Sequence, residues 1–379
     1  MTIATTSNIH SDSAADSSPD SMAVGGEGAS SAGSSTMLVS VIVPCRNEID
    51  HLESFLEALD RQRLDGLEVE FLIADGRSDD GTREILDRRA AVDPRLRVLD
   101  NVRRRIAPAL NLAIRAARGE VVVRMDVHTR YPEDYIARCV RVLAATGADN
   151  VGGPWLARGE TPFERAAAAV FPTRLASGGA ACRRPDLDGP VESVYLGCWR
   201  RSAFERFGLF DESLGGNEDD EFNLRTRRQG GVVRGSAEIR CWYRPRPNAL
   251  ALFRQHVGYG RWKVGVMRRH PTRIAWRRLA PAALVLALAI SLSLAAWVPL
   301  LLAIPVAYLL AIVVGTGVVA FRSNMPRSWP SMILAVLAMH LGYGVGTLLG
   351  SVRPSRVADP GPKSASETVA RAVADGSVA

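Results

Sequence analysis

The chain has 379 residues, a formal net charge of +7 and a hydrophobic content of 47%, which suffices for one sizeable globular domain and a more apolar region. Its five cysteines are widely spaced and form no CxxC pair, so they give no sign of a zinc site or redox couple and favour a reducing, cytosolic setting. Residues 1–36 are almost entirely Ser, Ala, Gly, Asp and Thr, which predicts a disordered tail, and no secretory signal is expected there.

Strands and helices alternate over the next part of the chain. Short apolar runs predict buried strands, and amphipathic segments between them predict helices. Such alternation with short connections indicates an α/β fold with a mostly parallel, doubly wound sheet. A helix is expected over 163–170 and another at the acidic run Glu218–Glu221. The predicted strands cover 38–43, 69–74, 97–99, 121–123 and 194–199.

The strand over 121–123 leads to a carboxylate and an imidazole, Asp126 and His128. In an open α/β sheet ligands bind at the carboxyl ends of the strands, and strand alternation would send both side chains to one face. A hard divalent cation that bridges a diphosphate suits this pair, because Mg²⁺ or Mn²⁺ takes one or two protein ligands and completes its shell with phosphate oxygens and water. The alternative is that Asp126 caps the next turn beside an unrelated histidine.

The C-terminal part of the chain changes character. Residues 253–279 are dense in Arg and Lys with interleaved aromatics, and the apolar region that follows favours a basic membrane-interface segment over a nucleic-acid patch. Residues 280–351 offer about three transmembrane helices, and the basic residues before them place the soluble domain in the cytoplasm. We therefore expect a multi-pass protein of the inner or plasma membrane, no nucleic-acid partner, and a disordered tail over 352–379. Three full crossings would place Arg353 and Arg356 outside the cytoplasm, against the usual distribution of positive charge. Either this bias is overridden, or the last segment enters the membrane without crossing it.

Several motifs occur in one order along the chain. They are Pro44-x-Arg-Asn-Glu48, Asp75-Gly76, Ser78-Asp-Asp-Gly-Thr82, Asp126-x-His128, Glu218-Asp219 and the basic-aromatic segment. Together they resemble the inverting family-2 glycosyltransferases of the GT-A fold, and most closely the succinoglycan-type exopolysaccharide glycosyltransferases. The resemblance runs from Val39 to His270 and implies a GT-A catalytic domain over 37–252.

The resemblance also implies a donor side for the site. His128 stands where the family's Asp-x-Asp motif has its second acid, so Asp126 and His128 would hold a divalent metal, with Mg²⁺ and Mn²⁺ both open. Local turn chemistry is the alternative for the acids that follow Asp75, and a solvated loop is the alternative for Arg103–Arg105. The nucleotide-sugar contacts would be Pro44, Arg46, Glu48, Asp75, Arg105 and Asp126.

On the acceptor side, the family's Glu-Asp pair at a helix start corresponds to Glu218 and Asp219. Asp219 would be the general base that takes the acceptor proton, with Glu218 as its support and Asp220 as the rival. Their alternative role is ordinary acidic placement at a helix N-terminus. The family's Gln-x-x-Arg-Trp motif appears only in a stretched form, with Gln255, Arg261 and Trp262 as acceptor-side residues. This departure favours single additions over processive polymerisation.

The expected function is transfer of a hexose, with UDP-glucose as the donor, to a polyprenyl-diphosphate-linked saccharide in exopolysaccharide biosynthesis. Within the class, a processive polysaccharide synthase and a transferase acting on a glycolipid or polyprenyl phosphate stay open. From other classes, a catalytically silent membrane scaffold would have no need for Asp75, Asp126 and Asp219 together. A membrane-tethered nucleic-acid binder rests only on the basic segment and predicts no metal-dependent binding of a UDP-sugar.

Overall fold

The structure is a computed structural model that describes residues 36–271 and 276–352. The two tails expected to be disordered, 1–36 and 352–379, lie outside the described residues except for Thr36 and Val352.

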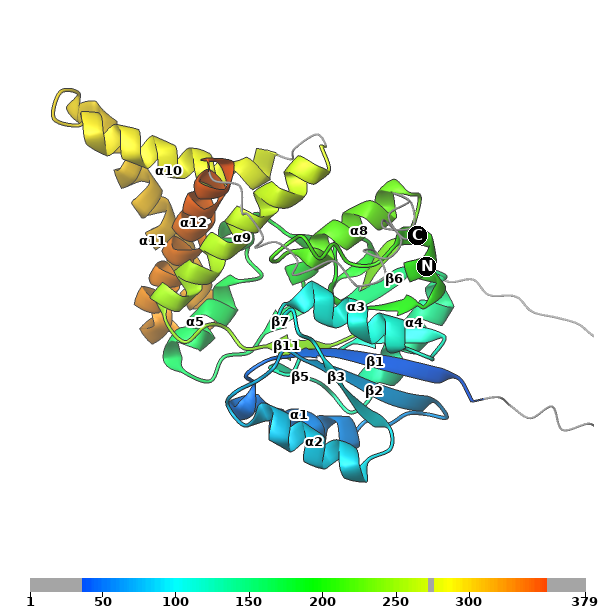
Figure 1. The fold of residues 1–379 in the computed structure, drawn as a ribbon. Coiled ribbons are helices and arrows are strands. Elements are labelled where there is room, and N and C mark those ends of the chain that lie inside the picture. The colour runs from blue at the N-terminus through cyan, green and yellow to red at the C-terminus, as the bar shows by residue number, and fades with distance from the viewer. Residues whose placement is uncertain (1–35, 272–275, 353–379) are drawn as a thin grey trace, which may run out of the picture. The chain divides into compact units, whose positions relative to one another are not determined.

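An eight-stranded sheet forms the centre of the fold (Figure 1). Its strands β3, β2, β1 and β4 are parallel, and β6 is parallel to β10, which confirms the expected mostly parallel sheet. β9 runs antiparallel between β4 and β6, and β8 is an antiparallel edge strand. In sheet order the strands are β3 (Leu96–Asp100), β2 (Glu68–Asp75), β1 (Leu38–Cys45), β4 (Val121–Arg124), β9 (Tyr195–Arg200), β6 (Asn150–Gly153), β10 (Val233–Ser236) and β8 (Asp188–Pro190).

Helices cover both faces of the sheet, as a doubly wound fold requires. In β1, Val41 and Val43 pack on one face with α1, α2 and α4, whereas Ile42 packs on the other face with α3, α7 and α8. Because β1 is buried on both sides, its sequence is a continuous apolar run and does not alternate with polar residues. The helices are α1 (Ile49–Asp60), α2 (Thr82–Val92), α3 (Ile106–Ala116), α4 (Tyr135–Thr146), α7 (Ser202–Phe207) and α8 (Glu218–Arg228).

A second, three-stranded sheet follows the carboxyl end of β4. The turn after Arg124 carries Asp126 and His128 and enters this sheet, whose strand order is β5, β11, β7. Aromatic residues join it to the main sheet, since the Trp155 ring stacks on that of Tyr195 with centroids 5.3 Å apart. The elements of this region are β5 (Thr129–Arg130), β7 (Trp155–Ala157), β11 (Cys241–Tyr243), α5 (Pro162–Val170), α6 (Arg174–Ser177) and the 3₁₀ turn η1 (Ala181–Arg183).

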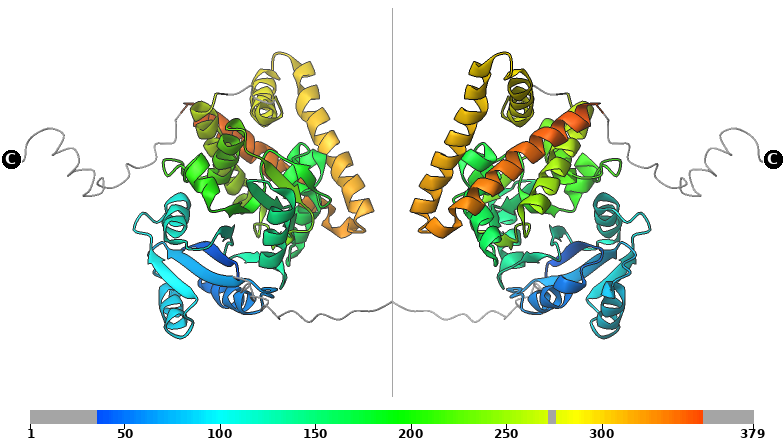
Figure 2. Two further views of the ribbon diagram at one scale, coloured as in Figure 1. Left: turned by 90° about the vertical axis from the view of Figure 1, so that its right-hand side faces the viewer. Right: turned by 90° about the vertical axis from the view of Figure 1, so that its left-hand side faces the viewer.

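The C-terminal part consists of helices α9 (Ala249–Arg269), α10 (Trp276–Leu294), α11 (Ala303–Arg322) and α12 (Trp329–Val352), with 3₁₀ turns η2 (Pro299–Leu302) and η3 (Pro326–Ser328). The basic segment expected over 253–279 is therefore a helix that starts at Ala249 and ends at Arg269, followed by the start of α10. The three expected apolar helices are present as α10, α11 and α12 (Figure 2).

α9 and α12 lie side by side and touch through glycines (Figures 1 and 2). A Cβ on Gly346 would lie 2.1 Å from the Val257 carbonyl oxygen, and one on Gly260 would lie 2.2 Å from the Tyr343 carbonyl oxygen. Gly342 and Gly350 repeat the close approach at four-residue spacing, which is the small-residue pattern that lets two helix backbones meet.

Two of the described helical segments are long and apolar enough to cross a membrane, 299–322 and 326–352. The apolar part of α10, 279–294, is shorter, so the expectation of three full spans is not supported. Half of the most apolar window of α12 is buried inside the protein, compared with 11% for α11. Trp297, Leu300 and Phe321 are 77–85% exposed, so the hairpin of α10 and α11 has a large apolar surface. This surface is suited to membrane association.

The glycine contact between α9 and α12 predicts a stability difference between two glycine variants. In Gly346→Val the new side chain meets the backbone of α9, which should cost about 1–3 kcal/mol of unfolding free energy. In Gly258→Ala the new Cβ meets no atom within 4 Å, so stability should stay within about 1 kcal/mol of the parent. Thermal unfolding of the full chain in detergent measures both. Equal melting temperatures for the parent and Gly346→Val would contradict the described packing.

Candidate active site

A buried arginine at the end of β4 gathers the carboxylates of the candidate site. Arg124 is 4% exposed and donates from Nε to Asp126 Oδ1 at 2.9 Å and from Nη2 to Asp126 Oδ2 at 3.2 Å. Its Nη1 donates to Glu218 Oε1 at 3.2 Å and to Asp219 Oδ1 at 2.6 Å. The motifs assign Asp126 to the donor side and Glu218 and Asp219 to the acceptor side. These residues, which are far apart in sequence, meet at a single guanidinium.

Asp126 and His128 do not lie on the strand, because β4 ends at Arg124. The expectation that strand alternation sends both side chains to one face was wrong, since they belong to a turn in which Thr129 N–H donates to the Asp126 carbonyl. The Tyr131 hydroxyl fixes this turn by accepting from the Asp126 N–H at 2.6 Å. His128 Nδ1 lies 3.1 Å from Glu48 Oε1, and its side chain is 43% exposed.

The contact with Glu48 settles which nitrogen of His128 could bind a metal. An ionised carboxylate only accepts hydrogen bonds, so Nδ1 carries the proton and Nε2 keeps its lone pair in the neutral ring. Burial lowers the pKa of His128, but the hydrogen bond to Glu48 and the charge of Asp126 outweigh it and raise the pKa above the usual value. Protons and metal ions would therefore compete for this ring.

The donor set around Asp126 suits a divalent cation that is shared with a ligand. The part of the chain that the structure describes holds no group of three or more His, Cys, Asp or Glu side chains placed to bind a metal by themselves. Mg²⁺ commonly needs only one or two protein ligands when phosphates supply the others. Arg124 and its three carboxylates carry a formal charge of −2 when all are ionised (one positive against three negative), which favours a nearby cation.

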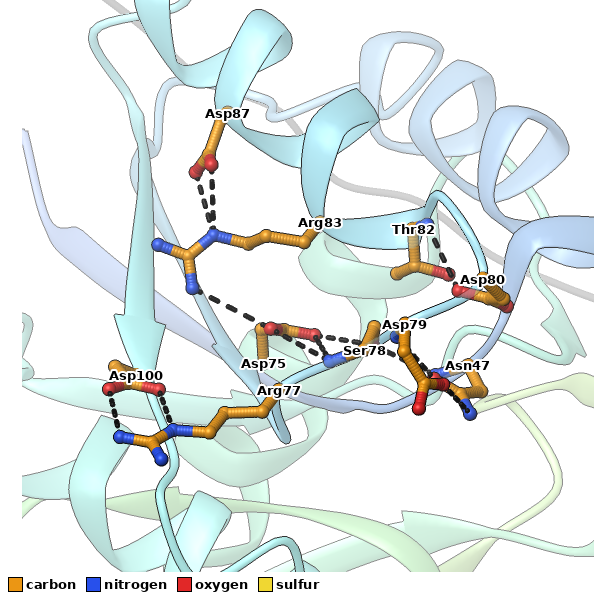
Figure 3. A network of polar contacts seen from close by, with 10 residues as sticks. All are labelled: Asn47, Asp75, Arg77, Ser78, Asp79, Asp80, Thr82, Arg83, Asp87 and Asp100. Atoms are coloured by element: carbon orange, nitrogen blue, oxygen red, sulfur yellow. Dashed lines mark hydrogen bonds and ion pairs between the residues drawn. The ribbon is translucent and has the colours of Figure 1, made fainter.

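Asp75 lies at the carboxyl end of β2, opposite Cys45 of β1, but its carboxylate is closed off. It is fully buried, accepts from Ser78 Oγ at 2.6 Å and lies 3.6 Å from Arg83 Nη1 (Figure 3). The following acids take part in turn contacts, as Asp79 accepts from the Asn47 side chain and Asp80 accepts from the Thr82 N–H. Direct contact between Asp75 and a nucleotide would require Ser78 or Arg83 to move.

Pro44, Arg46 and Glu48 line the adjoining end of β1. Pro44 pairs in register with Ala74 of β2. Arg46 lies over Gly76, where a Cβ would be 3.0 Å from Arg46 Cδ, and its Nη1 donates to the Arg104 carbonyl at 3.3 Å. Glu48 reaches His128, so the loop after β1 meets the turn after β4. The structure therefore brings these predicted donor-side residues to one edge of the sheet.

The arginines that were expected near the diphosphate contact the loop before α8. Arg105 Nη1 donates to the Glu212 carbonyl at 2.8 Å, and Arg103 pairs with the Glu212 carboxylate. Asn111 of α3 also donates to Glu212 at 2.9 Å. These contacts place Arg105 beside the segment that leads into the acidic helix.

The acidic residues at the start of α8 differ in their contacts. Burial raises the pKa of Asp219 well above the usual value, the charge of Arg124 lowers it, and the charges of Glu218 and Asp126 raise it again. The side chain is still 27% exposed, so a ligand can reach it. Asp220 is held by Lys263 Nζ at 2.7 Å, and Glu221 is bound by Arg225 and His270. Of the two rival bases, Asp219 alone contacts Arg124.

The predicted acceptor residues are all on α9, but they do not point to one place. Gln255 exchanges hydrogen bonds with the Tyr243 hydroxyl, and Arg261 is exposed. The Trp262 ring covers Gly215 and Gly216 just before α8, where a Cβ on Gly215 would lie 2.1 Å from the ring. α9 thus packs against the acidic cluster through Trp262 and against the small sheet through Gln255.

Two arginines have no role in the sequence predictions, Arg124 at this site and Arg183 beside the small sheet. Arg124 follows a run of valines, and its i+2 spacing to Asp126 is the signal that could have indicated a bidentate pair. Arg183 lies in the segment 171–194, whose sequence pattern is weak, and packs over Trp155 and Phe171.

Known proteins resemble this chain over most of its length. A family model described as Glycosyl transferase family 2 matches residues 40–205. The succinoglycan biosynthesis protein ExoA of Rhizobium meliloti (strain 1021) is 33% identical over 309 residues, which cover 81% of this chain and 92% of that protein. A transferase of Methanococcus voltae, whose name contains a dolichyl N-acetyl-alpha-D-glucosaminyl phosphate, is 23% identical and covers 63% of this chain and 76% of that protein.

Among solved structures, the mannosyltransferase PcManGT of Pyrobaculum calidifontis, in complex with GDP-Man and Mn²⁺, has a TM-score of 0.55 and 21% sequence identity. The match covers 81% of this chain and 88% of that chain, and it confirms the expected GT-A fold. The fold, the motif order and these relatives agree that the chain belongs to glycosyl transferase family 2.

Proposed function

We propose that this glycosyltransferase is a membrane-anchored, metal-dependent, inverting enzyme that moves glucose from UDP-glucose to a polyprenyl-diphosphate-linked saccharide in exopolysaccharide assembly. The observation that carries the proposal is the meeting of Asp126, Glu218 and Asp219 at Arg124. The relatives named for succinoglycan biosynthesis and for a dolichyl-linked sugar phosphate support the type of acceptor. The exposed apolar hairpin of α10 and α11 supports the membrane anchor.

In this proposal Asp219 is the base that removes the proton from the acceptor hydroxyl. Its raised pKa makes the ionised carboxylate a stronger base than an ordinary aspartate. Arg124 balances this effect, because its charge keeps part of the carboxylate population ionised. Inversion requires attack on the face of the sugar opposite to the leaving diphosphate. Arg124 holds the proposed base Asp219 and the proposed metal ligand Asp126 on different nitrogens, which suits a single displacement between them.

Asp126 and His128 would hold the divalent metal, with Arg124 and Glu48 orienting them from behind. Such a metal neutralises charge on the departing diphosphate and so serves in place of an acid residue. Pro44, Arg46, Glu48 and Arg105 would border the nucleotide. Asp75 would shape the uridine pocket by holding Ser78 and Arg83 in place.

Removing the Asp126 carboxylate should lower transfer by roughly 10²–10³-fold, the scale of losing one electrostatic stabiliser. The Asp126→Ala variant should also lose the dependence of UDP binding on Mg²⁺ or Mn²⁺. Glu57→Ala is the control, because Glu57 is an exposed carboxylate on α1 whose ion-pair partner, Arg61, is exposed as well. Near-normal turnover of Asp126→Ala in the presence of EDTA would contradict the metal site.

Replacing Asp219 by Asn preserves shape but removes the base, so the chemical step should slow by about 10²–10⁴-fold while the dissociation constant of UDP barely changes. Asp220→Asn should keep most activity, because Asp220 pairs with Lys263 and not with Arg124. Single-turnover kinetics and UDP titration measure both variants. If Asp219→Asn is fully active and Asp220→Asn loses activity, Asp220 is the base. Full activity of both variants would favour a purely structural role for the acidic run.

The charge of Arg124 predicts a shift in pH dependence. Arg124 lowers the pKa of Asp219, so its removal raises that pKa further and leaves the base protonated up to a higher pH. The acidic limb of the kcat profile should therefore move to higher pH in Arg124→Gln, and Arg124→Lys should return it toward the parent. An unchanged limb in a folded Arg124→Gln would show that Arg124 does not act on the base.

A further inference from the structure

Arg183 is a cation set among aromatic rings. Its guanidinium carbon lies 4.5 Å from the centroid of the Trp155 ring and 4.7 Å from that of Phe171. Its Nη1 is buried and has no hydrogen-bond partner in the described part of the chain. Burial lowers the pKa of Arg183, but the guanidinium stays charged because arginine is protonated at any pH at which proteins are folded.

Arg183 is partly buried, and a charge in such a place without a carboxylate partner among the described residues lowers the stability of the folded protein. Attraction of the guanidinium to the faces of two aromatic rings offsets part of the lost solvation energy. The rings do not bind the N–H groups at the edge of the guanidinium, which therefore stay available to an anion. A planar fork of N–H donors matches the oxygens of a phosphate better than any other protein cation. The chemistry of Arg183 therefore fits a phosphate or diphosphate group.

On one side, Arg183 is linked to the acidic helix through two aromatic residues. The Trp155 ring under its guanidinium lies with its centroid 6.3 Å from that of Tyr259 of α9. The Tyr259 carbonyl accepts from Asn217, the residue directly before α8, at 3.3 Å. Trp155 and Tyr259 thus stand between the guanidinium and the start of the acidic helix.

On its other side, Arg183 borders the apolar helices. Phe171 belongs to one hydrophobic cluster with Ile312 of α11 and Met339 of α12, and Trp155 packs against that cluster. A lipid chain that leaves a phosphate at Arg183 would thus meet apolar side chains directly.

We propose that Arg183 binds the phosphate group that joins the acceptor sugar to its lipid. The sugar then extends past Tyr259 toward Asp219, and the isoprenoid chain extends toward α11 and α12. This inference rests on the proposed function, because it assigns a part of the acceptor, and it places the lipid-linked phosphate at a residue separate from the donor diphosphate.

The test is a binding titration of the full chain in phosphatidylcholine nanodiscs, with farnesyl diphosphate as the probe and saturating UDP and Mg²⁺ to fill the donor site. The parent should bind farnesyl diphosphate, and Arg183→Gln should weaken that binding by roughly 10–100-fold, the scale of charge-assisted hydrogen bonds. Arg184→Gln is the matched control, because Arg184 is the next residue but is exposed and paired with Asp186. Its affinity should equal that of the parent.

Two further arms separate the possible sources of the phosphate. Farnesol should bind far more weakly than farnesyl diphosphate, and replacing part of the phosphatidylcholine by phosphatidylglycerol should not displace the probe. Equal binding by the parent and a folded Arg183→Gln, equal binding of farnesol, or displacement by phosphatidylglycerol would each overturn the assignment. If Arg183→Gln does not fold, Arg183→Lys keeps the charge without the planar fork and should give a smaller loss; parent-like affinity in that variant would overturn the assignment.

Hydrolysis of UDP-glucose without acceptor distinguishes the failure of this inference from that of the proposed function. Arg183→Gln should hydrolyse UDP-glucose at the rate of the parent while its transfer to lipid falls. A parent that neither binds nor hydrolyses UDP-glucose would overturn the proposed function. In that case the phosphate site is tested without nucleotide. The parent should still bind farnesyl diphosphate more tightly than Arg183→Gln does.

Discussion

The candidate site depends on one buried cation. Arg124, at the last position of β4, offers its guanidinium to Asp126 on its own turn and to Glu218 and Asp219 at the start of α8. Without that charge, the three carboxylates would repel one another in a poorly solvated place. The turn after β4 would also lose the arginine that joins it to the start of α8. A single central strand therefore sets both the position and the ionisation of groups contributed by two distant parts of the chain.

α9 extends the same arrangement toward the apolar helices. It meets the acidic run through Lys263 and Trp262, and it meets α12 through glycines whose missing side chains let the two backbones approach. The basic segment is thus part of the wall of the site, in addition to any role at a membrane surface. Polar and apolar surfaces adjoin at Arg183 and Phe171, which suits the proposed acceptor of a sugar joined to a lipid.

Much of the fold could be predicted from the sequence because buried parallel strands are continuous apolar runs, as in β1 and β2, and because polar turn residues follow them. The antiparallel placement of β9 could not, since an apolar run does not specify its direction. Among the candidate site residues, Asp126 was predicted from its place after a strand and Asp219 from the resemblance of Glu218-Asp219 to a family motif. Arg124 and Arg183 were missed because their roles depend on partners far away in sequence, and Asp75 proved closed because Ser78 and Arg83 contact it across a turn.

The most direct test of the account is the position of manganese in a crystal of the protein with UDP and Mn²⁺, located by its anomalous scattering. The account predicts a peak roughly 2 Å from a carboxylate oxygen of Asp126, beside the diphosphate and on the side of Arg124 that faces Asp219. UDP bound at the end of β1 with the manganese peak away from Asp126, or with no peak at all, would contradict it.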